Sequence, residues 1–124
     1  MALSKDKLDK IIAGFAFRLA REIPVEEVIL FGSYAHGKAK EHSDIDLAII
    51  SDWFNDKTHI ENMQYLSRVA ANYDTLIEAL PFTTEEYKNL DKRTFLASIV
   101  KSGRRYPLDK IKEKDQGSGL HSSL

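Results

Sequence analysis

Apolar residues recur every three or four positions in three stretches of the chain, a pattern that predicts amphipathic helices. The first stretch runs from Ser4, a candidate N-cap, to about Glu22, and the second covers residues 57–72. The third begins at Thr84 and ends at Gly103, a candidate C-cap. The helices are expected to pack their apolar faces against a common core.

Short, nearly continuous apolar runs lie between these stretches and predict buried strands. They cover residues 28–31, residues 44–50 and residues 75–80, with Pro81 expected to end the last one. A short helix is expected after Gly32–Ser33, where the first strand ends. Alternation of helices and strands in this order predicts an α/β (α+β) protein with one sheet covered by helices.

The length of 124 residues suits one domain with one core, which we place at residues 1–108. Residues 109–124 are charged and then rich in Gly and Ser, with little apolar content. Such a segment buries too little apolar surface to order itself, so we expect a disordered tail.

Composition narrows the class of protein further. The net charge of −1 gives no overall basic field to attract nucleic acid or an anionic membrane. The absence of cysteine excludes disulfides, thiolate metal sites and a cysteine nucleophile. The N-terminus has no signal-like apolar stretch, and no apolar run approaches membrane-spanning length. We therefore expect a soluble protein of the cytoplasm.

Two aspartates, Asp44 and Asp46, open the second predicted strand. Side chains two residues apart on a strand point to the same face, so these carboxylates should lie side by side. Like charges at close range are unfavourable unless a cation neutralises them, and Mg²⁺ prefers carboxylate and phosphate oxygens. Taken alone, however, this short and common pattern is more typical of a solvated strand entrance.

Gly32–Ser33 follows the first predicted strand and has the chemistry of a phosphate-binding turn. Glycine allows a close approach of the backbone to a ligand, and a following helix N-terminus would offer free N–H groups to phosphate. An ordinary strand-to-helix turn is the alternative. Because a phosphate turn and a metal-binding acidic pair occur together and in this order, the combination is far more specific than either part.

The sequence GSYAHG at residues 32–37, followed by SDIDL at residues 43–47, resembles the signature of the polymerase-beta nucleotidyltransferase superfamily. The short chain is most similar to its minimal nucleotidyltransferase (MNT) domains. The resemblance implies a mixed sheet with flanking helices, the polymerase-beta-like fold, and a third carboxylate on a neighbouring strand. Glu78 is the best match for that carboxylate, although the family more often has aspartate there, and Asp74 is the competitor.

The resemblance also implies the chemistry. Asp44, Asp46 and Glu78 would be the catalytic residues and the ligands of Mg²⁺, with two ions expected, and Gly32 and Ser33 would bind the nucleotide. The implied reaction transfers AMP from ATP, or a nucleotide from another NTP, to a hydroxyl acceptor. Many MNT domains pair with a HEPN-type protein, so the expected acceptor is a tyrosine of a HEPN ribonuclease toxin and the chain its antitoxin.

Two alternatives remain open from the sequence. The chain could be a binding module that neutralises its partner by contact without catalysis, which the glutamate at position 78 favours. It could instead transfer a nucleotide to a small molecule as part of a larger assembly. Self-association into a homo-oligomer is compatible with every interpretation.

Overall fold

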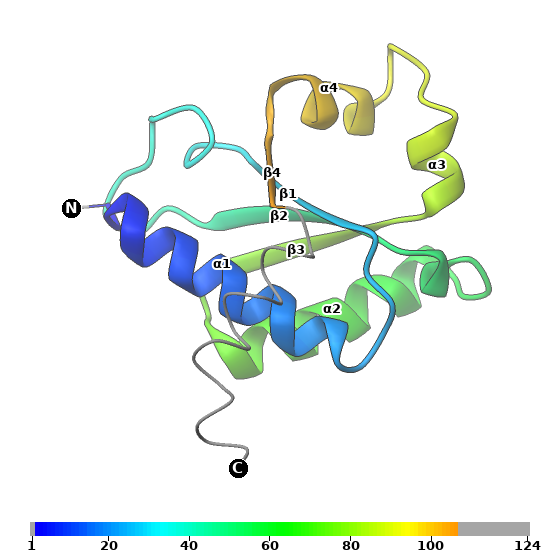
Figure 1. Ribbon diagram of the computed structural model, residues 1–124, viewed down its shortest axis with the longest axis horizontal. Helices are drawn as coiled ribbons and strands as arrows, with labels where there is room; N and C mark the ends of the chain where they lie inside the picture. The colour runs from blue at the N-terminus through cyan, green and yellow to red at the C-terminus, as the bar shows by residue number, and fades with distance from the viewer. Residues whose placement is uncertain (1, 107–124) are drawn as a thin grey trace.

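The computed structural model describes residues 2–106, which form a four-stranded mixed sheet with helices on both of its faces (Figure 1). The strands are β1 (Glu27–Phe31), β2 (Ile45–Ile50), β3 (Ile77–Phe82) and β4 (Arg104–Tyr106), in the spatial order β3-β2-β1-β4. Strand β2 runs parallel to β3, whereas β1 is antiparallel to both β2 and β4. The predicted mixed sheet is therefore confirmed.

Two long helices, α1 (Lys5–Ala20) and α2 (His59–Tyr73), cover one face of the sheet (Figure 1). As predicted, Ser4 caps α1, and its hydroxyl accepts a hydrogen bond from the Lys7 N–H at 3.2 Å. The main core lies between these helices and the sheet and includes Ile12, Phe15, Leu19, Val28, Leu30, Ile45, Leu47, Ile49 and Leu66.

The opposite face is covered only in part, by α3 (Thr84–Lys88) and α4 (Phe95–Ser102). A smaller cluster of Ile29, Ala48 and Ile99 joins α4 to β1 and β2. One helix was expected from Thr84 to Gly103. A helix does begin at Thr84, with Thr83 as its N-cap, but residues 89–94 divide the region into two helices. Because α3 and α4 are together shorter than one continuous helix, part of this face of the sheet is accessible to solvent.

Two further sequence-based expectations differ from the structure, and two short elements were not expected. The segment after Gly32 is a series of turns and not a short helix. Pro81 lies inside β3 instead of ending it, which is tolerated because β3 is an edge strand and a missing N–H can face outward. Strand β4 and the 3-10 helix η1 (Asp52–Phe54) were not predicted.

The predicted tail at residues 109–124 lies outside the described residues. Within residues 2–106, the structure contains no helix with both the length and the apolar character needed to cross a membrane.

Candidate active site

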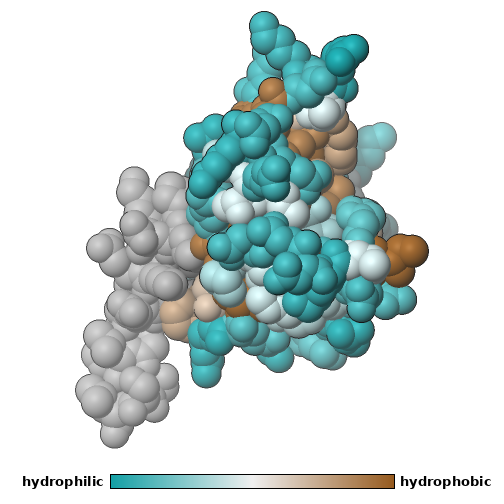
Figure 2. Space-filling model, turned by 90° about the vertical axis from the view of Figure 1, so that its right-hand side faces the viewer, coloured by the Kyte–Doolittle hydropathy of each residue, from teal (hydrophilic) through white to brown (hydrophobic). Residues whose placement is uncertain are grey.

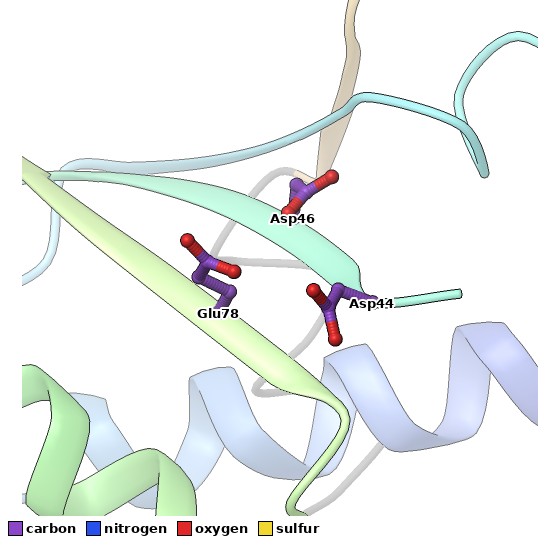
Figure 3. A group of neighbouring side chains, drawn as sticks. All are labelled: Asp44, Asp46 and Glu78. Atoms are coloured by element: carbon purple, nitrogen blue, oxygen red, sulfur yellow. The ribbon is translucent and has the colours of Figure 1, made fainter. Parts of the chain in front are cut away.

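Three carboxylates, those of Asp44, Asp46 and Glu78, meet on the partly covered face of the sheet (Figure 3). One oxygen from each lies within 4.8 Å of the others. Asp46 is the second residue of β2, and its neighbours Ile45 and Leu47 point into the core under α1 and α2. Strand alternation therefore turns Asp46 to the other face. The structure brings the three predicted residues together.

The register between β2 and β3 explains why Glu78 lies beside Asp44 and Asp46. In the parallel ladder between β2 and β3, Asp46 lies directly opposite Glu78. Directly opposite residues share a face of the sheet, so the two carboxylates converge although 32 positions separate them in the sequence. Asp44 lies just before β2 and approaches the same point from the strand entrance (Figure 3).

Asp74, the competing candidate, lies elsewhere and has another role. It caps the C-terminus of α2, and its carboxylate accepts a hydrogen bond from the Leu76 N–H at 2.9 Å. Its backbone carbonyl accepts a second bond from the Ile77 N–H at 3.1 Å. Asp74 therefore shapes the turn that leads into β3 and is outside the acidic cluster.

The acidic cluster is electrostatically unfavourable without a cation. Partial burial, followed by repulsion from Glu78 and Asp44, raises the pKa of Asp46 to about 6. Among residues 2–106, no lysine or arginine forms an ion pair with any of the three carboxylates. Three carboxylates lie close together here without a positive side chain to neutralise them. Such a group suits a hard divalent cation, and it suits Mg²⁺ best when phosphate oxygens complete the coordination shell of the ion.

Gly32 is packed against this cluster, which the sequence did not reveal. Its φ of +73° is in the left-handed region. A Cβ atom at this position would overlap the carboxylate of Asp46, with its Cγ only 3.0 Å away. The glycine was expected to allow a ligand close to the backbone, and the structure shows that it also makes room for Asp46.

The turn that follows leaves hydrogen-bond donors available. The Ser33 carbonyl accepts bonds from the His36 N–H at 3.3 Å and the Lys38 N–H at 2.9 Å, which close the turn. Within residues 2–106, the Ser33 hydroxyl and N–H have no hydrogen-bond partner. Because there is no helix here, an anion would be bound by turn donors and not by a helix dipole.

Ser43 belongs to the SDIDL segment, although the sequence alone gave it no role. In the structure it positions the chain just before Asp44. Its hydroxyl accepts a hydrogen bond from the Lys40 N–H at 2.7 Å, and its own N–H donates to the Lys40 carbonyl at 3.1 Å. These two bonds close a turn immediately before Asp44. The serine of the SDID sequence therefore fixes the path by which the chain enters the acidic cluster.

Replacing Gly32 and Gly37 separately should distinguish backbone strain from the packing of the acidic cluster. Both have positive φ, at 73° and 69°, but a Cβ at Gly37 meets nothing within 4 Å. Each alanine variant should lose about 1 kcal/mol of stability from strain. Only Gly32→Ala should also displace Asp46 and weaken Mg²⁺ binding, measured by calorimetry. Equal loss of metal affinity in both variants would contradict this assignment.

The raised pKa of Asp46 has a consequence for stability without metal. An acid with a pKa of about 6 in the folded state and 3.8 when unfolded stays protonated longer in the fold. Stability should therefore fall as pH rises from about 4 to about 6 and stay lower above that. In EDTA at pH 7.5, Asp46→Asn should be more stable than the wild type by about 1 kcal/mol, a value reduced for partial exposure.

Thermal unfolding of the wild type and Asp46→Asn, followed from pH 4 to pH 7.5 in EDTA, checks this expectation. The stability difference should become small near pH 4, where Asp46 is protonated in the folded state and close to half protonated when unfolded. Excess Mg²⁺ at pH 7.5 should stabilise the wild type more than the variant. A difference that is the same at both ends of the pH range would mean that charge at Asp46 is not its source.

Comparisons with known proteins agree with this geometry. The nucleotidyltransferase domain model matches residues 8–116. A presumed protein adenylyltransferase of Methanocaldococcus jannaschii is 29% identical over 80 residues, which span 64% of this chain and 76% of that protein.

A presumed nucleotidyltransferase from Sulfolobus solfataricus superposes with a TM-score of 0.56 at 22% identity, over 71% of this chain and 83% of the other, which supports the fold. A toxin–antitoxin structure with AMP-PNP aligns over 90% of this chain and 92% of the other at 20% identity, but its TM-score of 0.46 is too low to support any inference. The family match, over most of the length, shows that this chain belongs to the nucleotidyltransferase domain family and is an enzyme of the nucleotidyltransferase class.

Proposed function

We propose that this chain is a magnesium-dependent protein adenylyltransferase that transfers AMP from ATP to a hydroxyl group of a partner protein. The observation that carries the proposal is the meeting of Asp44, Asp46 and Glu78 within 4.8 Å. The Gly32 backbone lies against the same Asp46 carboxylate, so the phosphate turn and the acidic cluster form one continuous site.

Each residue has a distinct role in this proposal. The free N–H and hydroxyl of Ser33 bind the β- and γ-phosphates. Asp44, Asp46 and Glu78 would hold Mg²⁺, with two ions expected, and the metal would supply positive charge that offsets charge developing on the phosphates. Catalysis otherwise depends on positioning the reactants and on neutralising charge.

Glu78 acts as the base that accepts the proton of the acceptor hydroxyl. The acceptor oxygen forms a bond to the α-phosphorus in line with the bond to pyrophosphate, which breaks. The hydroxyl proton passes to the Glu78 carboxylate, and pyrophosphate leaves with the electron pair. Glu78 is solvent-exposed on edge strand β3, so an acceptor group of another molecule can reach it.

The proposed acceptor is a tyrosine of a HEPN-type ribonuclease toxin, which would make the chain an antitoxin that silences its partner by modification. Two observations support a protein acceptor. The related Methanocaldococcus protein carries the name of a protein adenylyltransferase. Glu78 is also exposed on the edge strand β3, where another protein could approach it.

A non-catalytic antitoxin is the second candidate, and glutamate in place of the usual aspartate at position 78 is the observation that favours it. One experiment separates the two functions. The wild-type chain and a co-purified partner are incubated with ATP and Mg²⁺, and intact masses are measured. The partner should gain the mass of AMP on a tyrosine. Full neutralisation of an unmodified partner would refute the enzymatic proposal and support the binding module.

A further inference from the structure

An aromatic pair borders the acidic cluster on the side away from Glu78. Strand register places Phe31 directly opposite Asp46 on β1, just as it places Glu78 opposite Asp46 on β3. Phe31, Asp46 and Glu78 therefore form one row across the same face of the sheet. Phe95, the first residue of α4, contacts Phe31 edge to face with ring centroids 5.6 Å apart.

Phe95 is exposed, and other residues of α4 attach this helix to the core. Phe95 is 57% exposed, whereas Leu96 and Ile99 on the same helix are only 4% and 2% exposed and pack the helix against the sheet. The face seen in Figure 2 is mostly hydrophilic, with separate patches of hydrophobic colour. Single exposed apolar residues are common, and what distinguishes Phe95 is its position: its exposed ring contacts Phe31, which lies in the same row as Asp46.

The order of residues along this row indicates what could bind there. Glu78 is at one end, where the acceptor hydroxyl would lose its proton in the proposed reaction. Phe31 is at the other end and directly precedes Gly32 and Ser33, the proposed phosphate turn. A nucleotide bound between that turn and the acidic cluster would lie on the Phe31 side of Asp46, where Phe31 and Phe95 are the aromatic side chains available to its base.

We propose that Phe95, supported by Phe31, stacks against the base of the bound nucleotide and gives the site its preference for a purine. This inference rests on the proposed function, because it requires a nucleoside triphosphate at the Gly32–Ser33 turn. Stacking of a base on an aromatic side chain tolerates any base but is strongest for the larger purine rings.

The test measures the affinity of Mg²⁺–ATP and of Mg²⁺–tripolyphosphate, which has the phosphates and no base, by calorimetry. Phe95→Ala should weaken ATP binding about tenfold or more, the usual effect of losing a stacked base. It should leave tripolyphosphate binding unchanged and reduce the preference for ATP over CTP. Phe95→Trp should restore ATP affinity, because it provides a larger stacking surface.

Leu90→Ala is the matched control, because Leu90 is another exposed apolar side chain on the segment before α4 and is 37% exposed. It should bind ATP and tripolyphosphate like the wild type. Unchanged ATP affinity in Phe95→Ala would overturn the proposal, and so would an equal loss of tripolyphosphate binding. A change confined to the KM of the protein acceptor would assign Phe95 to the acceptor instead, which also overturns it.

Failure of the proposed function would give a different result. If the wild type binds neither ATP nor tripolyphosphate in the presence of Mg²⁺, the nucleotide site itself is absent and the proposed function fails first. If the wild type binds both and Phe95→Ala binds both equally well, the nucleotide site stands and only the role of Phe95 is refuted.

Discussion

The double variant Asp44→Asn, Asp46→Asn is expected to lose AMP transfer by at least about a thousandfold, because metal-based charge stabilisation is worth several kcal/mol. Asparagine keeps the size of each side chain but removes the two negative charges that attract the cation. The change leaves the fold intact, since it removes repulsion around a carboxyl group whose pKa is raised to about 6. Magnesium-dependent ATP binding should be lost in parallel.

Single-turnover AMP transfer and ATP calorimetry with and without Mg²⁺ measure both effects. Asp52→Asn is a suitable control, because Asp52 is an exposed aspartate just beyond the other end of β2. It should behave like the wild type in both assays. If the double variant binds ATP with the same dependence on Mg²⁺ as the wild type, the two aspartates are not metal ligands.

The Glu78→Gln variant is expected to retain most of its ATP affinity and to lose AMP transfer by about a hundredfold or more, the typical contribution of general-base assistance. Glutamine has the same length as glutamate but does not accept the proton of the acceptor hydroxyl. The turn at Ser33 and the two aspartates still hold the nucleotide. The effect should therefore appear in the transfer step and only weakly in binding.

The Glu78→Asp variant tests the longer side chain itself. It restores the residue more usual in the family, so activity should be retained or increased if the shorter acid reaches the same position. The non-catalytic interpretation makes the opposite forecast, namely that the partner stays unmodified with every variant and is neutralised even by Glu78→Gln. Intact mass of the partner after incubation with each variant decides between them.

Much of the candidate site followed from the sequence because its signals are local. That Asp44 and Asp46 share a face depends only on the two-residue repeat of an extended chain. The helices α1 and α2 were visible in their apolar spacing, since an amphipathic helix shows its buried face directly in the sequence. Glu78 was identified through family resemblance, and its position in an apolar run agreed with a strand.

Other local patterns were misleading. The turn after Gly32 looked like a helix start, but bonds to the Ser33 carbonyl close it as a series of turns. Pro81 looked like the end of a strand, and only the position of β3 at the sheet edge makes it acceptable inside one. Strand β4 has three partly or fully exposed residues without an apolar alternation, so its pairing with β1 is its sole signature.

The sequence by itself determined the chemical groups of the candidate site: two carboxylates two residues apart at the start of a strand, a glycine turn before them, and a third acid in an apolar run. Tertiary structure alone decided how these parts meet. The register of β2 with β3 sets Glu78 opposite Asp46, the register of β1 adds Phe31 to the row, and Gly32 accommodates the Asp46 carboxylate. Register depends on how the intervening helix and loops pack, which is a long-range balance of burial that no short pattern of residues encodes.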